Sequence, residues 1–369
     1  MKLPKKIQEF LTLIDVKIDG NRPWDFKVNN PKVFDRFLAE GTLGVGESYM
    51  DKWWDVDKLD EFIYRVKKQK LDKKLITLGL VAHVIKSKVV NLQTKSKSKK
   101  VAKQHYDIGN KFYENMLDKR MQYTCAYWKN AKTLDQAQEH KLDLICKKLQ
   151  LKRGDTILEL GGGWGGFAKY AAEKYGCNVT SYNISEEQVK YARNLCKGLP
   201  VKIILDDYRH AKGTFDKVVA IGICEHIGYK NYRNFMKLAN RCLKKHGLFL
   251  LHTIAQDTST TTTDPWIAKY IFPNGMLPSF KQLSVAAEGY FVLEDWHNFS
   301  ADYDKTLMAW YANFNKNWPK FKEQYGERFY RMWSFYLLSC AGFFRAREGQ
   351  LYQIVFSKEG LPGGYVSIR

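Results

Sequence analysis

The sequence lacks any long apolar run. No stretch approaches the roughly 20 consecutive apolar residues that a membrane-spanning helix needs. The first residues, MKLPKKIQEF, also lack the apolar block and small-residue cleavage site of a secretory signal. We therefore expect a cytoplasmic protein.

Cysteine pairs and metal-ligand patterns are also missing. The seven cysteines are an odd number in a 369-residue chain, and none of them forms a C-x-x-C pair. No histidine pair stands near them at the spacing of zinc ligands. Neither disulfide bonds nor a bound metal is expected.

Acidic residues are scarce relative to basic ones. The chain has 60 Lys and Arg against 39 Asp and Glu, which gives a formal net charge of +21. Such a surface attracts polyanions, either nucleic acid or the anionic face of a bilayer. Because lysine-rich surfaces also serve solubility alone, charge does not choose a partner.

The composition divides the chain into three segments. Residues 1–85 combine helical periodicity with many aromatics and a glycine-punctuated turn at EGTLGVGESYMDKWW, which predicts a small, mainly helical N-terminal domain. Residues 86–104 carry seven lysines and no acid, which is typical of a basic linker. Residues 105–369 are expected to form a catalytic domain, with two long insertions that contact the substrate.

Short β-type runs alternate with helix-length segments in this third part. They occupy residues 156–160, 178–183, 201–206, 216–223 and 247–254. Strands separated by helices predict parallel βαβ units, and therefore an α/β fold with a doubly wound, mainly parallel Rossmann-like sheet. Residues 291–296 and 351–357 are expected to add two final strands, the last as an antiparallel edge.

A glycine-rich turn follows the first of these strands. In ILELGGGWGGF, Gly161, Gly163 and Gly166 have the G-x-G-x-x-G spacing, which lets a ligand approach the backbone and a helix pack closely on the strand. The pattern predicts an adenosine-containing ligand without saying which one.

Two details favour S-adenosylmethionine over a nicotinamide dinucleotide. Glu159, two residues before the first glycine, can take the ammonium of a methionine moiety. Asn183 ends the next strand, where a dinucleotide site has Asp or Glu for the ribose. After the third strand, Asp207 can accept from an adenine amino group and Tyr208 can flank the base.

Longer motifs resemble a known family. They include HYDIGNKFYENML, LELGGGWGG, GICEHIGYKNY, LLHTI, DPWIAKYIFPNGMLPS and EDWHNFSADYDKTLMAWY. In these the chain looks like a cyclopropane-fatty-acyl-phospholipid synthase, of the cyclopropane/mycolic acid synthase family of S-adenosylmethionine-dependent methyltransferases. The resemblance runs from about residue 100 to the end, with a weaker echo in GESYMDKWW. One departure is Gly162, where the family usually has Cys, and we expect it to make the loop more flexible without removing a catalytic group.

The resemblance implies methylene transfer from S-adenosylmethionine to the cis double bond of an unsaturated phospholipid acyl chain. It implies a cofactor site formed by Tyr123, Thr124, Gly161, Gly163, Asn183, Gln188 and Tyr208. It also implies a bicarbonate ion that serves as the base, held by Cys125, Glu225, His252, Ile254 and Tyr303. The implied partners are phospholipid, met peripherally at the inner face of the cell membrane, and a second copy of the chain in a homodimer, but no nucleic acid.

The chemistry agrees with these residue types. An alkene is a weak nucleophile, so methyl attack must generate a carbocation before a proton leaves the new methyl group. The site must exclude water and tolerate a cation, which aromatic faces can do. Glu225 comes just after the predicted strand 216–223, and His252 lies near the end of the predicted strand 247–254. Doubly wound sheets place ligands at these carboxyl ends. Taken alone, however, Cys125 and His252 are equally consistent with buried core residues.

Two other activities fit the same cofactor site. A small-amine N-methyltransferase would need no bicarbonate, because an amine brings its own lone pair. An acyl-chain methyl-branching enzyme would differ only in how the cation is quenched. A binding module driven by charge alone is disfavoured by the glycine loop and Glu159.

Overall fold

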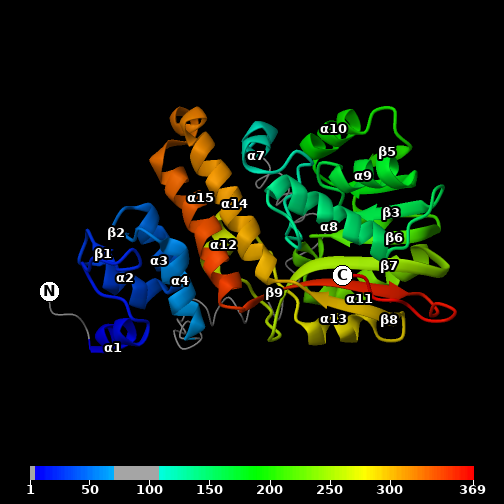
Figure 1. Ribbon diagram of the computed structural model, residues 1–369. Coiled ribbons are helices and arrows are strands. Elements are labelled where there is room, and N and C mark those ends of the chain that lie inside the picture. Colours follow the sequence, from blue (N-terminus) through cyan, green and yellow to red (C-terminus); the bar gives the residue numbers. More distant parts are fainter. Residues whose placement is uncertain (1–4, 70–107) are drawn as a thin grey trace. The chain divides into compact units, whose positions relative to one another are not determined.

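The computed structural model describes residues 5–69 and 108–369, which divide into two compact units (Figure 1). The helical unit comprises residues 5–69, 262–273 and 303–349. The sheet unit comprises residues 108–261, 274–302 and 350–369. The basic linker predicted at 86–104 lies outside the described residues, so its boundaries stay predictions.

The N-terminal part of the helical unit is built from short helices around an aromatic core. Its elements are α1 (Lys5–Leu13), β1 (Lys27–Val28), α2 (Val33–Glu40), α3 (Thr42–Met50), β2 (Trp54–Asp55) and α4 (Leu59–Lys68). Trp54 and Phe26 are buried and stack with ring centroids 4.9 Å apart. The expected helical character of this segment is confirmed.

The turn predicted within EGTLGVGESYMDKWW is wrong, because most of it forms helix α3. A Cβ on Gly44 would lie 2.5 Å from the carbonyl oxygen of Arg36, and one on Gly46 would lie 2.3 Å from the ring of Trp266. These glycines therefore permit close packing rather than a turn.

Three helices from later in the chain complete the helical unit. They are α12 (Pro265–Tyr270), α14 (Ala301–Asn317, from Tyr303 onward) and α15 (Lys322–Arg345). The Arg345 guanidinium of α15 joins α14 to α4, since it pairs with Asp304 at 2.9 Å and with Asp60 at 2.8 Å. The sequence places residues 303–349 in the catalytic segment, whereas in the fold they group with the N-terminal helices.

The sheet unit contains one seven-stranded sheet in the order β5-β4-β3-β6-β7-β9-β8. The strands are β3 (Thr156–Leu160), β4 (Asn178–Asn183), β5 (Val201–Leu205), β6 (Phe215–Ile221), β7 (Leu243–Gln256), β8 (Val292–Asn298) and β9 (Gly349–Ser357). The first five strands in this order, β5-β4-β3-β6-β7, pair in parallel, as predicted. Strand β9 pairs antiparallel with β8, but β8 is the edge and β9 lies inside the sheet, so the predicted edge position of the last strand is wrong.

Helices cover both faces of this sheet (Figure 1). Alternate strand residues point to opposite faces of the sheet. On one face, Ile157 packs against α8 (Leu134–Lys148) and α9 (Gly166–Tyr175). On the other face, Leu158 packs against α11 (Tyr232–Cys242) and α13 (Phe280–Ala287). The remaining helices of the unit are α7 (Asn110–Met116) and α10 (Glu186–Leu195), with short 3-10 turns η2 (Tyr208–His210) and η3 (Cys224–His226). The fold class is confirmed.

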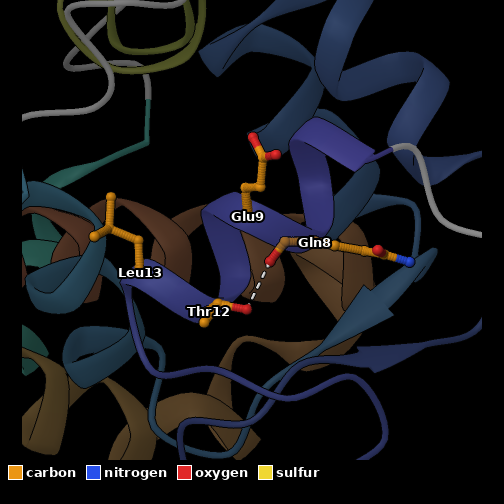
Figure 2. Close-up of a pocket in the computed structure, with 4 residues that line it drawn as sticks. All are labelled: Gln8, Glu9, Thr12 and Leu13. Atoms are coloured by element: carbon orange, nitrogen blue, oxygen red, sulfur yellow. Dashed lines mark hydrogen bonds between the residues drawn. The ribbon is translucent and has the colours of Figure 1, made fainter.

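The surface of α1 carries an open hollow lined by Gln8, Glu9, Thr12 and Leu13 (Figure 2). The Thr12 hydroxyl donates to the carbonyl of Gln8 at 2.9 Å, which is an ordinary contact within a helix. This hollow has no arrangement of groups that suggests chemistry.

Within the described ranges, no helix has both the length and the apolar composition needed to cross a bilayer.

Candidate cofactor and catalytic site

The glycine loop joins β3 to α9, as the sequence predicts. Gly161 and Gly163 adopt φ values of 83° and 51°, in the left-handed region that favours glycine. The N–H groups of Gly161 and Gly162 both donate to the carbonyl of Tyr182, which holds the loop against the end of β4. The backbone at Gly163 is open, since a Cβ there would meet nothing within 4 Å.

Gly162 has a steric role beyond the loop flexibility expected from the sequence. A Cβ at this position would lie 1.8 Å from the Ser181 hydroxyl and 2.7 Å from Glu159 Oε2. The absence of a side chain at Gly162 therefore makes room for Ser181. A cysteine could not enter this loop unless Ser181 moved or changed.

Glu159 is a buried acid at the end of β3. It is only 2% exposed, and its Oε2 has no well-formed hydrogen bond among the described residues. Burial raises the pKa of Glu159 to about 7, while the nearby Ser181 hydroxyl and Lys141 ammonium act to lower it. A buried carboxylate that lacks a full partner beside an open glycine backbone is suited to receive the ammonium of a methionine moiety.

Asn183 and Gln188 lie together behind the glycine loop. The Asn183 amide donates to the carbonyl of Gly163 and to Gln188 Oε1, both at 2.9 Å. Its Oδ1 accepts from the N–H of Ser185 at 3.0 Å. The structure thus brings these two predicted residues together, and their printed contacts brace the loop.

Asp207 and Tyr208 follow β5. The carboxylate of Asp207 accepts from the backbone N–H and from the guanidinium of Arg209, both at 2.9 Å. The Tyr208 ring meets the buried ring of Phe235 edge-on, and burial raises its pKa to about 12. Both residues lie at the carboxyl end of the sheet, where an adenine would bind, although Asp207 would share its oxygens with Arg209.

The segment that contains Tyr123, Thr124 and Cys125 is held from behind by α8. The Lys141 ammonium, fully buried, donates to Gln122 Oε1 at 2.6 Å and to Thr124 Oγ1 at 2.9 Å. Burial lowers the pKa of Lys141 to about 8. Gln138 donates from the same helix to the carbonyl of Thr124 at 2.9 Å. Sequence reasoning missed both α8 residues.

Cys125 itself is fully buried, and its thiol lies 3.3 Å from the carbonyl of the next residue. Tyr123 is partly buried, with its ring edge-on to Tyr113 at 5.3 Å. Both residues belong to the sheet unit.

Glu225 and Ile254 form a direct contact between the ends of β6 and β7. The backbone N–H of Ile254 donates to Glu225 Oε1 at 2.6 Å. The Ile254 donor, predicted to bind bicarbonate, is therefore engaged by the acid. Glu225 Oε2 is buried without a hydrogen bond among the described residues, and burial raises the pKa of Glu225 to about 7.

His252 lies on β7, opposite Ile221 at the end of β6, and is 1% exposed. Its Nδ1 lies 3.2 Å from the side-chain nitrogen of Gln353 on β9. Its Nε2 is buried and has no hydrogen bond among the described residues. Burial holds the pKa of His252 well below its usual range, so the ring is neutral.

Tyr303 belongs to the helical unit, on α14. It is buried, and its ring stacks on Phe344 with centroids 4.4 Å apart. The other four predicted bicarbonate ligands belong to the sheet unit, so the joint site stays a prediction.

The residues present fit a small anion with a hydroxyl group. Glu225 Oε2 and His252 Nε2 are buried polar atoms that both lack a protein partner in the described part of the chain. His252 on β7 pairs in register with Ile221, the last residue of the neighbouring strand β6, and Glu225 follows β6 in the turn η3. A carboxylate acceptor and an imidazole donor match the hydroxyl and an oxygen of bicarbonate.

Comparisons with known proteins identify the family of the chain. The sequence profile of the family described as mycolic acid cyclopropane synthetase matches residues 93–354. The chain is 49% identical over 361 residues to the cyclopropane-fatty-acyl-phospholipid synthase of Escherichia coli strain K12, covering 96% of this chain and 93% of that protein.

Two solved structures are similar to this chain. A mycolic acid cyclopropane synthase complexed with SAH and CTAB matches with a TM-score of 0.66 and 30% identity, over 70% of this chain and 98% of that one. A coclaurine N-methyltransferase bound to N-methylheliamine and SAH has a TM-score of 0.70 over 85% of this chain and 99% of that one. Its identity is 22%, so this second likeness concerns the fold alone.

The resemblance inferred from the sequence motifs is confirmed, and it extends over the N-terminal residues, where only a weak echo is visible in the sequence. The chain belongs to the mycolic acid cyclopropane synthetase family.

Proposed function

We propose that this chain is a cyclopropane-fatty-acyl-phospholipid synthase. It transfers a methylene group from S-adenosylmethionine to the cis double bond of an unsaturated phospholipid acyl chain. The observation that carries the proposal is the pair of unsatisfied buried groups Glu225 Oε2, in the turn after β6, and His252 Nε2, on the neighbouring strand β7. They occur in a family member with an intact glycine loop. An amine substrate brings its own lone pair and needs no bound bicarbonate, so it would leave these two groups without a function.

The cofactor supplies an electrophilic methyl group on a sulfonium. Glu159 binds the methionine ammonium, and the open backbone at Gly163 allows close approach of the ligand. Gln138 and Lys141 hold the Tyr123–Cys125 segment in place next to the loop. The roles of Asn183 and Gln188 are to fix the loop conformation, and Asp207 and Tyr208 receive the base.

Aromatic rings close to His252 exclude water and tolerate positive charge on the acyl chain. The ring of Phe299 lies 6.0 Å from that of His252 and 5.2 Å from that of Tyr127. Phe299 is buried, while Tyr127 is partly buried.

Bicarbonate is the proposed base. Glu225 would accept from its hydroxyl and His252 Nε2 would donate to one of its oxygens. Cys125, Ile254 and Tyr303 are the further ligands that the family resemblance implies, and the Ile254 N–H would be shared with Glu225 Oε1. Bound there, the ion would supply a weak base able to take a proton from the new methyl group. The carboxylate of Glu225 would hold this ion next to η3, the turn that follows β6.

The substrate requires peripheral contact with a membrane. The net charge of +21 supports attraction to anionic headgroups, at about 1 kcal/mol for each lysine or arginine near the surface. The membrane contact at the inner face of the cell membrane and the homodimer are proposals. Vesicle flotation and sedimentation velocity, respectively, test them.

The activity is tested with purified protein, S-adenosylmethionine and vesicles of a cis-monounsaturated phospholipid. We expect each modified acyl chain to gain one CH2, and its proton NMR spectrum to contain cyclopropane ring hydrogens. Vesicles of the fully saturated phospholipid are the matched control and should gain nothing.

The alternatives predict other outcomes. The same mass gain without ring hydrogens would indicate methyl or methylene branching. No gain on lipid, with methylation of small amines, would indicate an N-methyltransferase. Loss of activity in bicarbonate-free buffer, restored by added bicarbonate, would support the proposed base.

A further inference from the structure

We infer that Gln353 is a positioning residue that fixes the tautomer of His252, so that Nε2 carries the proton and points a donor into the site. The inference rests on the proposed function, because it assigns His252 Nε2 to the anion. It concerns a residue on β9, 101 positions away along the chain.

The contact is fully enclosed. Gln353 is 0% exposed and His252 is 1% exposed, and the Gln353 side-chain nitrogen lies 3.2 Å from His252 Nδ1. In this arrangement the amide N–H donates and Nδ1 accepts. Because a neutral imidazole has one donor and one acceptor nitrogen, acceptance at Nδ1 leaves the proton on Nε2.

The opposite orientation of the amide is less favourable. As placed, the carbonyl oxygen has no partner among the described residues, and the nitrogen uses one of its two N–H groups on Nδ1. With the amide reversed, that oxygen would accept from an Nδ1–H, and both N–H donors of the buried amide would be left over instead. Unsatisfied buried N–H groups are rarer than carbonyls with incomplete hydrogen bonding.

The charges around the ring keep it neutral. Lys141 and Lys148 both oppose protonation of His252, and burial acts in the same direction. A neutral ring makes the tautomer decisive, since an imidazolium would donate from both nitrogens whatever Gln353 did. Gln353 therefore determines whether Nε2 donates to an anion or repels it.

The test is histidine-selective 15N labelling of the full chain, with two-bond proton–nitrogen correlation spectra to assign the ring nitrogens. The signals of His252 are identified as those lost in His252→Gln. We expect the Nε2–H tautomer in the unsubstituted protein. Gln353→Glu should move the proton to Nδ1, because a carboxylate accepts and cannot donate.

Gln350→Met is the matched control. Gln350 is a buried glutamine on the same strand, but it bonds Asn298 and Ser300 instead of the histidine. The control should leave the His252 tautomer unchanged even where it lowers the melting temperature. For Gln353→Glu we expect methylene transfer to fall on the order of 100-fold, with the fold retained by circular dichroism.

The outcomes separate this inference from the proposed function. An Nδ1–H tautomer in the unsubstituted protein, or an unchanged tautomer in Gln353→Glu, would overturn the role of Gln353 even in an active enzyme. The expected tautomers in a protein that does not modify lipid would support the role while refuting the proposed function.

Discussion

The buried acid at the cofactor site makes ligand binding depend on pH in a calculable way. Glu159 has its pKa raised to about 7 by burial, so at about pH 6 the free protein holds a proton on most copies of this carboxyl. Pairing with the ammonium of a methionine moiety requires the carboxylate. Binding at about pH 6 should therefore release about 0.9 proton per site, as follows from the pKa and the pH.

The same pKa fixes the change in affinity. At a pH below the pKa of Glu159, the carboxyl must lose its proton before the ligand ammonium can pair with it, and this loss weakens binding. At a pH well above the pKa the carboxyl is already ionised, so binding does not change. The affinity should therefore rise with pH, by about tenfold from about pH 6 to about pH 8. SAH is the suitable probe, because it carries the same ammonium and carboxylate and does not react.

Isothermal titration calorimetry in two buffers of different ionisation enthalpy measures the released proton directly. Glu159→Gln should bind SAH more weakly and release no proton. Glu225→Gln is the matched control, since its carboxyl is also buried with a pKa of about 7 but is not assigned to the cofactor. Equal heats in the two buffers for the unsubstituted protein, or undiminished release in Glu159→Gln, would refute the assignment of Glu159.

Two further predictions concern residues that support the site. Gly162→Ala should lower the free energy of unfolding by about 1–3 kcal/mol, because the new Cβ collides with the hydroxyl of Ser181. In urea unfolding, adding Ser181→Ala should recover part of that loss. Equal losses in the single and double variants would contradict this. Lys141→Met should lower the rate of methylene transfer on the order of tenfold, because the buried ammonium holds the Thr124 hydroxyl in place. The control Lys147→Met, at an exposed position of α8, should leave the rate unchanged. Equal rates in the two variants would argue against this role of Lys141.

The strands near the cofactor were predictable because their signals are local. Residues 156–160 and 178–183 are strands with the predicted bounds, since each combines an apolar run with a turn or helix signal directly after it. The glycine loop was predictable for the same reason, because its conformation depends on neighbouring residues. Glu159 was predictable from its place two residues before that loop.

Features that depend on distant parts of the chain were not predictable. Gly44 and Gly46 resemble turn glycines in sequence, and only the contacts with Arg36 and Trp266 explain why they lie in a helix. Strand β9 is internal because it lies between β7 and β8, and a linear pattern does not encode these neighbours. Gln353 stands in an ordinary apolar strand motif, so its contact with a histidine 101 positions away leaves no local signal.

The most direct test of the account uses S-adenosylmethionine with a fully deuterated methyl group and vesicles of a cis-monounsaturated phospholipid. Methyl attack followed by loss of one hydrogen from the new methyl group predicts ring products that keep two of the three deuterium atoms, both on the ring methylene. Products that keep all three deuterium atoms, or that carry them on an open chain, would contradict methylene transfer as the function of this site.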